Sequence, residues 1–154
     1  MANELIKKEF NHIFSNKDYS YPLNATMATS WIIAHYKGFN IKAFNMQGSS
    51  SLCDYNVIAT VTNSTQAKSL VNELCSNLKQ HDINIISTEG LTDAEWILID
   101  AGDIIIHIFE ENTRELYNLD KLWIEHEQVK IPTEFYFAAH EKDEVKETGP
   151  TDYF

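Results

Sequence analysis

Basic residues are scarce in this chain, and arginine is almost absent. The 154 residues include 23 acidic residues against 12 lysines and arginines, a net charge of −11, and Arg114 is the single arginine. Proteins that bind nucleic acid over a broad face need clustered basic side chains to displace counterions from phosphates. We therefore expect no direct, sequence-specific binding of nucleic acid. An acidic protein of this kind is better suited to docking on a basic protein.

Cysteines and long apolar runs are also few. Cys53 and Cys75 stand far apart and form no C-x-x-C pair, so we expect free thiols in a reducing compartment. No run approaches the ~18 consecutive apolar residues of a membrane span, and the N-terminus lacks the pattern of a secretory signal. Gly-rich phosphate loops and G-x-S-x-G motifs are absent too. The sequence predicts a cytoplasmic protein with no membrane segment and no cofactor.

The apolar residues that are present follow clear periodic patterns. At 44% hydrophobic and 12% aromatic residues, the composition is that of a globular domain. Helical spacing predicts helices over residues 3–15, 24–37 and 63–80, and a further helix after Glu110. We expect N-caps at Asn24 and at Asn63 or Ser64, and a C′ residue at Gly38. Short apolar runs predict strands over residues 41–46, 54–61 and 83–87, and a tight hairpin over 96–109.

This order of elements predicts an α/β (α+β) fold, with a single mixed sheet of about five strands covered by helices. We expect an N-terminal helical extension over residues 1–23 and a main domain over 24–124. Residues 125–154 carry eight acids against three lysines and predict an acidic, partly flexible tail. Within that tail, the apolar patch at residues 135–137 is expected to dock on the body.

The predicted hairpin carries the sharpest candidates for chemistry. Asp100, Asp103 and His107 flank or follow the turn at Ala101 and Gly102, and Asp103 and His107 are four residues apart, hence on one face of a strand. Such a set could bind a metal or act as acid and base. In the competing interpretation the acids accept backbone N–H groups around the turn, and His107 is a hydrogen-bonded, half-buried residue. No third strong ligand is evident, so we predict no metal site.

The aromatic residues near the hairpin fit either a core or an interface, because Trp, Tyr and Arg dominate interface hot spots. Trp96 alternates with Leu98 and Asp100 along one side of its strand, while Ile97 and Ile99 occupy the other. A strand that is apolar on both faces must be covered on both, by its own helices or by a partner. Arg114 could also be structural and pair with Asp103 or Glu110.

Several segments also occur in a fixed order between about Asn40 and Trp123. They read GSSSLCDY from Gly48, WILIDAGD from Trp96, IHIF from Ile106, and R-x-x-Y-x-L-x-x-L-W from Arg114 to Trp123. In this order and spacing the chain resembles the ribosomal silencing factor family (Iojap/RsfS). The resemblance implies a protein without enzymatic activity that binds the large ribosomal subunit through ribosomal protein fourteen and blocks joining of the small subunit. It also implies a nucleotidyltransferase-like fold that lacks the catalytic acids.

The resemblance and the residue chemistry together give the predicted sites. The predicted partner-binding residues are Trp96, Leu98, Asp100, Gly102, Asp103, His107, Arg114 and Tyr117. The predicted structural residues are Asp54, Tyr55, Leu119, Leu122 and Trp123. The chain departs from the family's usual pattern at Asn45, Asn56, Val61 and Thr65.

Two alternatives stay open at this point. One is a metal-dependent hydrolase or nucleotidyltransferase-like enzyme that uses Asp54, Asp100, Asp103 and His107, although two-metal phosphoryl transfer needs a second strand acid where this chain has Asn56. The other is a homodimer that hides the apolar face of the hairpin.

Overall fold

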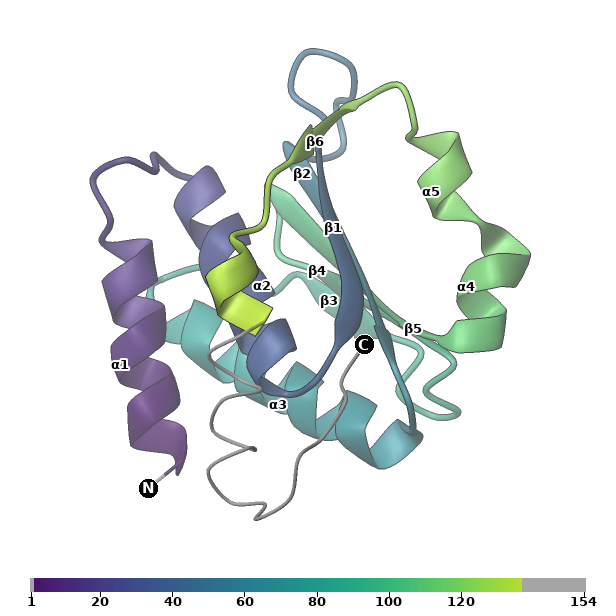
Figure 1. Cartoon of the computed structure of the whole chain (residues 1–154), viewed down its shortest axis with the longest axis horizontal. Helices are drawn as coiled ribbons and strands as arrows, with labels where there is room; N and C mark the ends of the chain where they lie inside the picture. Colours follow the sequence, from purple (N-terminus) through teal and green to yellow (C-terminus); the bar gives the residue numbers. More distant parts are fainter. Residues whose placement is uncertain (1, 137–154) are drawn as a thin grey trace.

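One mixed six-stranded sheet lies between two groups of helices in the computed structural model, which describes residues 2–136 (Figure 1). The helices are α1 (Ala2–Phe14), α2 (Leu23–His35), α3 (Ser64–Gln80), α4 (Glu111–Tyr117) and α5 (Leu119–Leu122). The strands are β1 (Phe39–Asn45), β2 (Tyr55–Val61), β3 (Ser87–Glu89), β4 (Trp96–Asp100), β5 (Ile104–Glu110) and β6 (Glu127–Val129). The predicted mixed α/β class is confirmed.

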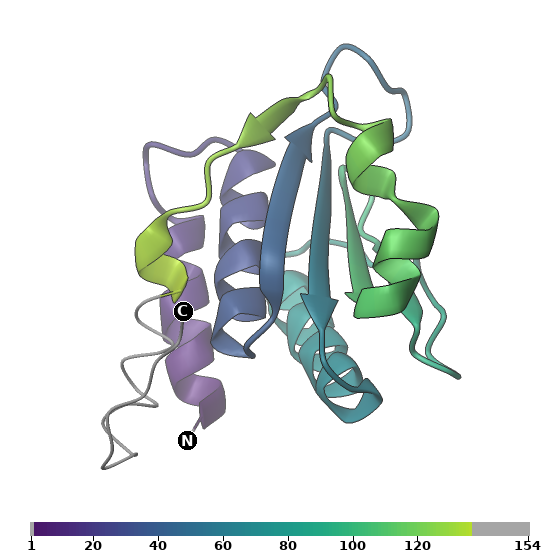
Figure 2. The same cartoon turned by 45° about the vertical axis from the view of Figure 1, so that its right-hand side comes forward.

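The strands lie in the order β3-β4-β5-β2-β1-β6. β2 and β5 pair in parallel at the centre, from Tyr55 opposite Ile104 to Val61 opposite Glu110, and every other pair is antiparallel. Helices α1, α2 and α3 lie on one face of this sheet, and α4 and α5 lie on the other (Figure 2). The sheet therefore has a face covered by long helices and a face covered by short ones.

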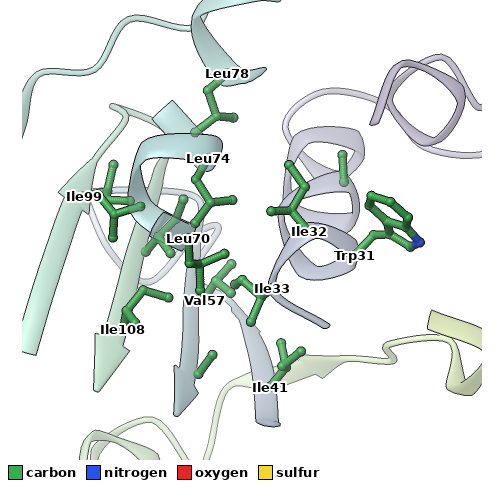
Figure 3. Close-up of a cluster of buried hydrophobic side chains, with 14 of the residues drawn as sticks. Trp31, Ile32, Ile33, Ile41, Val57, Leu70, Leu74, Leu78, Ile99 and Ile108 are labelled. Carbon is green, nitrogen blue, oxygen red and sulfur yellow. The ribbon is translucent and has the colours of Figure 1, made fainter. Parts of the chain in front are cut away.

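The main core lies between the sheet and helices α2 and α3. Leu70, Leu74 and Leu78 of α3 point toward the strands, where Val57, Ile99 and Ile108 meet them (Figure 3). All six of these side chains are 0% exposed. Asn63 is the N-cap of α3 and accepts a hydrogen bond from the Gln66 N–H at 2.8 Å, as predicted.

Helix α2 is enclosed on all sides, because every residue from Asn24 to Ala34 is buried. α1 covers its outer side through Ile6, Phe10 and Ile13. The predicted N-cap at Asn24 is wrong, since Pro22 holds that position. Asn24 lies in the first turn of the helix and donates from its side chain to the carbonyl of Phe14 at 3.0 Å, which ties α1 to α2.

The end of α2 also differs by one residue from the prediction. Lys37 takes the left-handed C′ position (φ +64°), and Gly38 follows it and donates its N–H to the carbonyl of Ile33 at 2.8 Å. A Cβ at residue 38 would lie 2.4 Å from Cγ2 of Ile33. The glycine is therefore required by a close approach and not by its own backbone angle.

Three further predictions need correction, all at short elements. Residues 83–86 are not a strand, because Ile83 closes the end of α3 by donating its N–H to the Leu78 carbonyl, and β3 covers only Ser87–Glu89. The single helix expected after Glu110 is interrupted at Asn118, which is left-handed (φ +49°) and separates α4 from α5. A sixth strand, β6, lies inside the predicted tail and pairs with β1.

After β6 the chain returns to the side of the sheet that carries α1 and α2, and residues 133–136 form a helical turn there. Phe135 and Tyr136 pack against the main core, which confirms the predicted docking of this patch for the two residues described. Phe137 and the remainder of the predicted tail lie outside the described residues. Over the part of the chain that the structure describes, no helix combines the length and hydropathy needed to span a membrane.

Candidate functional site

Strand β4 presents two different faces, as its alternation predicted. Ile97 and Ile99 are 0% exposed and face the helices of the main core. Trp96, Leu98 and Asp100 are half-buried on the opposite face. The neighbouring strand β5 repeats the pattern, and Ile105, His107 and Phe109 share the face with Trp96.

The short helices cover only part of this second face. Trp96 stacks on Phe109 with ring centroids 4.9 Å apart and contacts Tyr117 at the end of α4 at 4.8 Å. Tyr117 is still 55% exposed, and Leu98 and Ile105 stay half-buried. We call the set Trp96, Leu98, Ile105 and Tyr117 the open face.

Beside the open face, a smaller core holds α5 on the sheet. It is formed by Phe44, Met46, Cys53, Ile58 and Phe109. Leu119 of α5 and Trp123, which directly follows the helix, pack against it. The ring of Trp123 lies 5.7 Å from Phe44 and 5.5 Å from His107. Leu122, in contrast, points outward and is 69% exposed, as is Leu116 on α4 at 78%.

His107 is buried under this surface, and both its ring nitrogens have partners. The indole N–H of Trp96 donates to Nδ1 at 3.2 Å, and Nε2 lies 3.1 Å from Oδ1 of Asn56. Burial lowers the pKa of His107 to about 4, so the ring is neutral at pH 7. Because an indole can only donate, Nδ1 accepts and Nε2 carries the proton. The hydrogen-bonded interpretation of His107 is confirmed, with deeper burial than expected.

Asp100 and Asp103 have different partners at the hairpin turn. Asp100 accepts the Gly102 N–H at 3.0 Å, as the competing interpretation predicted, and Gly102 has a positive φ of +84°. Asp103 lies just before β5 and accepts the hydroxyl of Tyr21 at 3.0 Å, not a backbone N–H. Burial, and then Asp103, raise the pKa of Tyr21 to about 12.

Asp54 and Tyr55 join the start of β2 to this turn, since both of their N–H groups donate to the carbonyl of Asp103, at 2.8 and 3.1 Å. The adjacent Cys53 is buried, and burial followed by the charges of Asp54 and Asp100 raises the pKa of its thiol to about 11. The thiol is therefore protonated at neutral pH and is a poor nucleophile. Among the described residues, no three or more His, Cys, Asp or Glu side chains are grouped so that they could hold a metal ion.

Arg114 is buried and joins the short helices to the sheet. Its guanidinium makes a two-pronged contact with Asp120 at 3.2 and 2.8 Å, and Nη1 donates to the Asn40 carbonyl at 2.6 Å and to Oγ1 of Thr60 at 2.9 Å. Its predicted pairing with Asp103 or Glu110 is wrong. Glu110 is instead the N-cap of α4, and the bend at Asn118 is followed directly by α5, which carries Asp120.

The same carboxylate of Asp120 also meets Lys42 of β1 at 3.0 Å. Burial alone would raise the pKa of Asp120, but the hydrogen bonds and charges of Arg114 and Lys42 outweigh it and lower the pKa to about 2. One carboxylate on α5 thus holds two cations from α4 and β1.

Sequence reasoning missed three contributors to this region. Asn56 was noted as a departure from the family pattern and as an amide where two-metal enzymes have an acid, but not as the partner of His107. Asp120 carried no signal, because its role depends on the bend at Asn118. Ile105 belongs to the open face, and the alternation along β5 that predicted a face for His107 could have placed it there.

The comparisons with known proteins converge on one family. A family model described as "Ribosomal silencing factor during starvation" (RsfS) matches residues 23–152, a wider range than the segments that carry the resemblance. A protein of Zymomonas mobilis named ribosomal silencing factor RsfS is 38% identical over 87 residues, which cover 56% of this chain and 65% of that protein. The protein of the same name from Haemophilus influenzae is 37% identical over 87 residues, covering 56% and 85%.

A solved structure from Bacillus halodurans agrees with these matches. It superposes with a TM-score of 0.59 at 31% sequence identity, covering 69% of this chain and 95% of that one. The long family match, the relatives at more than 30% identity and the shared fold establish that this chain belongs to the ribosomal silencing factor (RsfS) family.

Proposed function

We propose that this protein represses translation by binding the large ribosomal subunit through ribosomal protein fourteen and sterically blocking the approach of the small subunit. Membership of a ribosomal silencing family supports a role at the ribosome and in regulation. The resemblance of residues 40–123 to that family carries the choice of subunit and of partner protein.

The main support for the position of the docking site is the open face. Trp96 and Tyr117 form a partly exposed aromatic pair on a sheet that α4 and α5 leave partly uncovered. Trp and Tyr are among the residue types that dominate interface hot spots. Glu89 on the neighbouring strand β3 and Asp100 on β4 itself lie beside Leu98 on the same face. We propose that these residues, with Gly102 and Asp103 of the hairpin turn, form the contact with the ribosome. His107 and Arg114 are buried and would support that contact from beneath.

Charge favours a protein partner over rRNA. The chain carries a net charge of −11, which attracts a basic ribosomal protein and repels exposed phosphates. A standard interface buries about 1,600 Å² in total. Occupying that area on the subunit surface is sufficient to exclude the other subunit, so the mechanism needs no reaction. The absence of enzymatic activity is part of the proposal.

The test is co-sedimentation of purified protein with isolated large subunits, followed by addition of small subunits. We expect the wild type to pellet with large subunits and to reduce formation of complete ribosomes. Trp96→Ala should weaken both effects at least tenfold, with the loss of an anchor of this kind. Leu5→Ala, on the outer side of α1, is the matched control and should bind like the wild type. Equal pelleting of Trp96→Ala and wild type would place the docking site elsewhere.

A second copy of this chain is the alternative occupant of the open face. Sedimentation velocity over a hundredfold dilution separates the two. If Trp96→Ala dissociates a dimer without affecting ribosome binding, the face is a dimer interface and the proposal is wrong in its choice of partner.

A further inference from the structure

A chain of hydrogen bonds crosses three adjacent strands beneath the open face. It runs from Trp96 on β4 to His107 on β5 and on to Asn56 on β2, through contacts of 3.2 and 3.1 Å. The three residues are diagonal neighbours, because Leu98 is the direct partner of His107 on one side and Ile58 on the other. Asn56 and His107, which are 51 positions apart in the sequence, are thus joined in one chain that ends at the indole of Trp96.

The chemistry of the three groups gives this chain a fixed direction. The indole N–H of Trp96 only donates, so Nδ1 of His107 must be the acceptor. The single proton of a neutral imidazole then lies on Nε2 and is donated to the carbonyl oxygen of Asn56. A doubly protonated His107 would place an N–H against the indole N–H and break the first link.

The surroundings of His107 keep it in the neutral form. The rings of Trp96, Phe109 and Trp123 pack around it, with centroids 6.0, 6.3 and 5.5 Å away. Burial lowers its pKa to about 4, and no charged side chain contributes to that shift. The acceptor for Trp96 is therefore available at all physiological pH values.

These contacts fix both the position and the hydration of Trp96. Phe109 stacks on the ring, Tyr117 contacts it at a tilt, and His107 accepts its N–H. A free indole N–H on a docking surface would lose its water on binding and would need an acceptor from the partner. Here the donor already has an acceptor inside the protein. A partner therefore meets only the hydrocarbon part of the ring.

We propose that His107 and Asn56 are positioning residues that act through Trp96, holding its indole for docking and satisfying its N–H so that an apolar surface of the partner can cover it. The inference rests on the proposed function. It adds a specificity rule, namely that the partner presents apolar groups, and not a hydrogen-bond acceptor, to the ring of Trp96.

Asn56→Asp tests the proposal, because it places a carboxylate beside Nε2 and raises the pKa of His107. Above the new pKa the imidazole stays neutral and the chain is intact. Below it the imidazolium forms and the link to Trp96 is lost. We expect wild-type affinity for large subunits to be unchanged between pH 8 and pH 6. The variant should match the wild type at pH 8 and bind roughly tenfold more weakly at pH 6, as expected when one buried donor loses its acceptor.

Asn72→Asp is the matched control, since it adds the same charge at an exposed position of α3, on the other side of the sheet from His107. Its affinity should show no new pH dependence. NMR supplies a second readout on the free protein: the Trp96 indole proton should be protected from exchange in the wild type. It should lose that protection in Asn56→Asp at pH 6, in step with titration of His107.

Two outcomes would overturn the inference. One is an Asn56→Asp variant in which His107 titrates near neutral pH while the affinity and the indole proton stay unchanged. The other is an unprotected Trp96 indole proton in the wild type. If the wild type does not bind large subunits at all, the proposed function fails, and the indole proton of the free protein still decides whether the hydrogen-bond chain exists.

Discussion

The two faces of the sheet are built from the same strands but in different ways. On β5, Ile104, Ile106 and Ile108 point toward α2 and α3 and are 0% exposed. The residues between them on the same strand, Ile105 and His107, lie among aromatic rings and polar partners on the other side. One face supplies aliphatic burial, and the other presents a shaped, partly uncovered surface.

Helix length explains much of the difference. α2 and α3 have 13 and 17 residues, whereas α4 and α5 have 7 and 4. Helices this short shield little area and gain little stability from their own hydrogen bonds. Polar anchors such as Arg114 with Asp120 therefore hold them in place. If the open face is the docking site, as we propose, stability and docking depend on opposite sides of one sheet, and substitutions on the two sides can test this.

The largest loss of stability is expected from a substitution at Phe10. This residue of α1 packs into the main core on the side of the sheet that the long helices cover. Its side chain is 0% exposed, so Phe10→Ala should lower the free energy of unfolding by about 3–5 kcal/mol. Urea denaturation measures this, with the exposed Lys8→Ala on the same helix as control, expected within about 0.5 kcal/mol. A loss below about 1 kcal/mol for Phe10→Ala would mean that α1 is not part of the covered core.

Ile105 and Ile106 are neighbours on β5 but lie on opposite faces of the sheet, so substituting each in turn compares the contributions of the two faces. Ile106→Ala removes a fully buried side chain and should cost about 2–5 kcal/mol, while half-buried Ile105→Ala should cost roughly half as much. Ribosome binding by the folded variants should show the reverse order, with only Ile105→Ala weakened. The proposed division of roles between the two faces would be wrong if Ile106→Ala impairs ribosome binding more than Ile105→Ala under conditions in which both variants are folded.

The contact of Asp120 with Arg114 and Lys42 should matter less, because the carboxylate is partly exposed. Asp120→Asn should destabilise by about 1–2 kcal/mol at pH 7, as a buried arginine loses its charge partner in part. The pKa of Asp120 is lowered from 3.8 to about 2 on folding, so its stabilisation is present above pH 4 and lost as pH falls toward 2. Urea titrations at pH 7, 4 and 2.5 should show the gap between variant and wild type closing. A gap that is independent of pH would contradict this role of the charge.

The smallest effect on stability is expected at Leu116, which is 78% exposed on α4. Leu116→Ser should change the free energy of unfolding by no more than about 0.5 kcal/mol. Because Leu116 adjoins Tyr117, the variant should still weaken pelleting with large subunits several-fold. Unchanged pelleting would limit the docking surface to the sheet and Tyr117.

Local signals in the sequence were sufficient for the long elements. The spacing of Leu70, Leu74 and Leu78 after the Asn63 cap predicted α3, and the alternation around Ile97 and Ile99 predicted both faces of β4. In these segments the pattern of apolar residues and the tertiary environment agree, so the local pattern alone is informative.

The failures lie where distant residues decide the outcome. β6 is three residues, Glu127–Val129, without apolar alternation, and it is a strand only because β1 pairs with it. Residues 83–86 are rich in isoleucine, but the N–H of Ile83 bonds to the Leu78 carbonyl at the end of α3 and not to a neighbouring strand. For the site, the types of Trp96, Asp100 and His107 were recognised, whereas the partners Asn56 and Asp120 depend on register and on a bend that no local signal reveals.

The position of β6 has a practical consequence. Four strand spacings of about 4.8 Å, roughly 19 Å in all, separate it from β4, and the chain then crosses to the side of α1 (Figure 2). Both ends of the described chain therefore lie behind the sheet, away from Trp96. An affinity handle or fluorescent reporter placed before α1 should therefore leave the proposed docking surface uncovered, so that ribosome binding can be measured with a labelled protein.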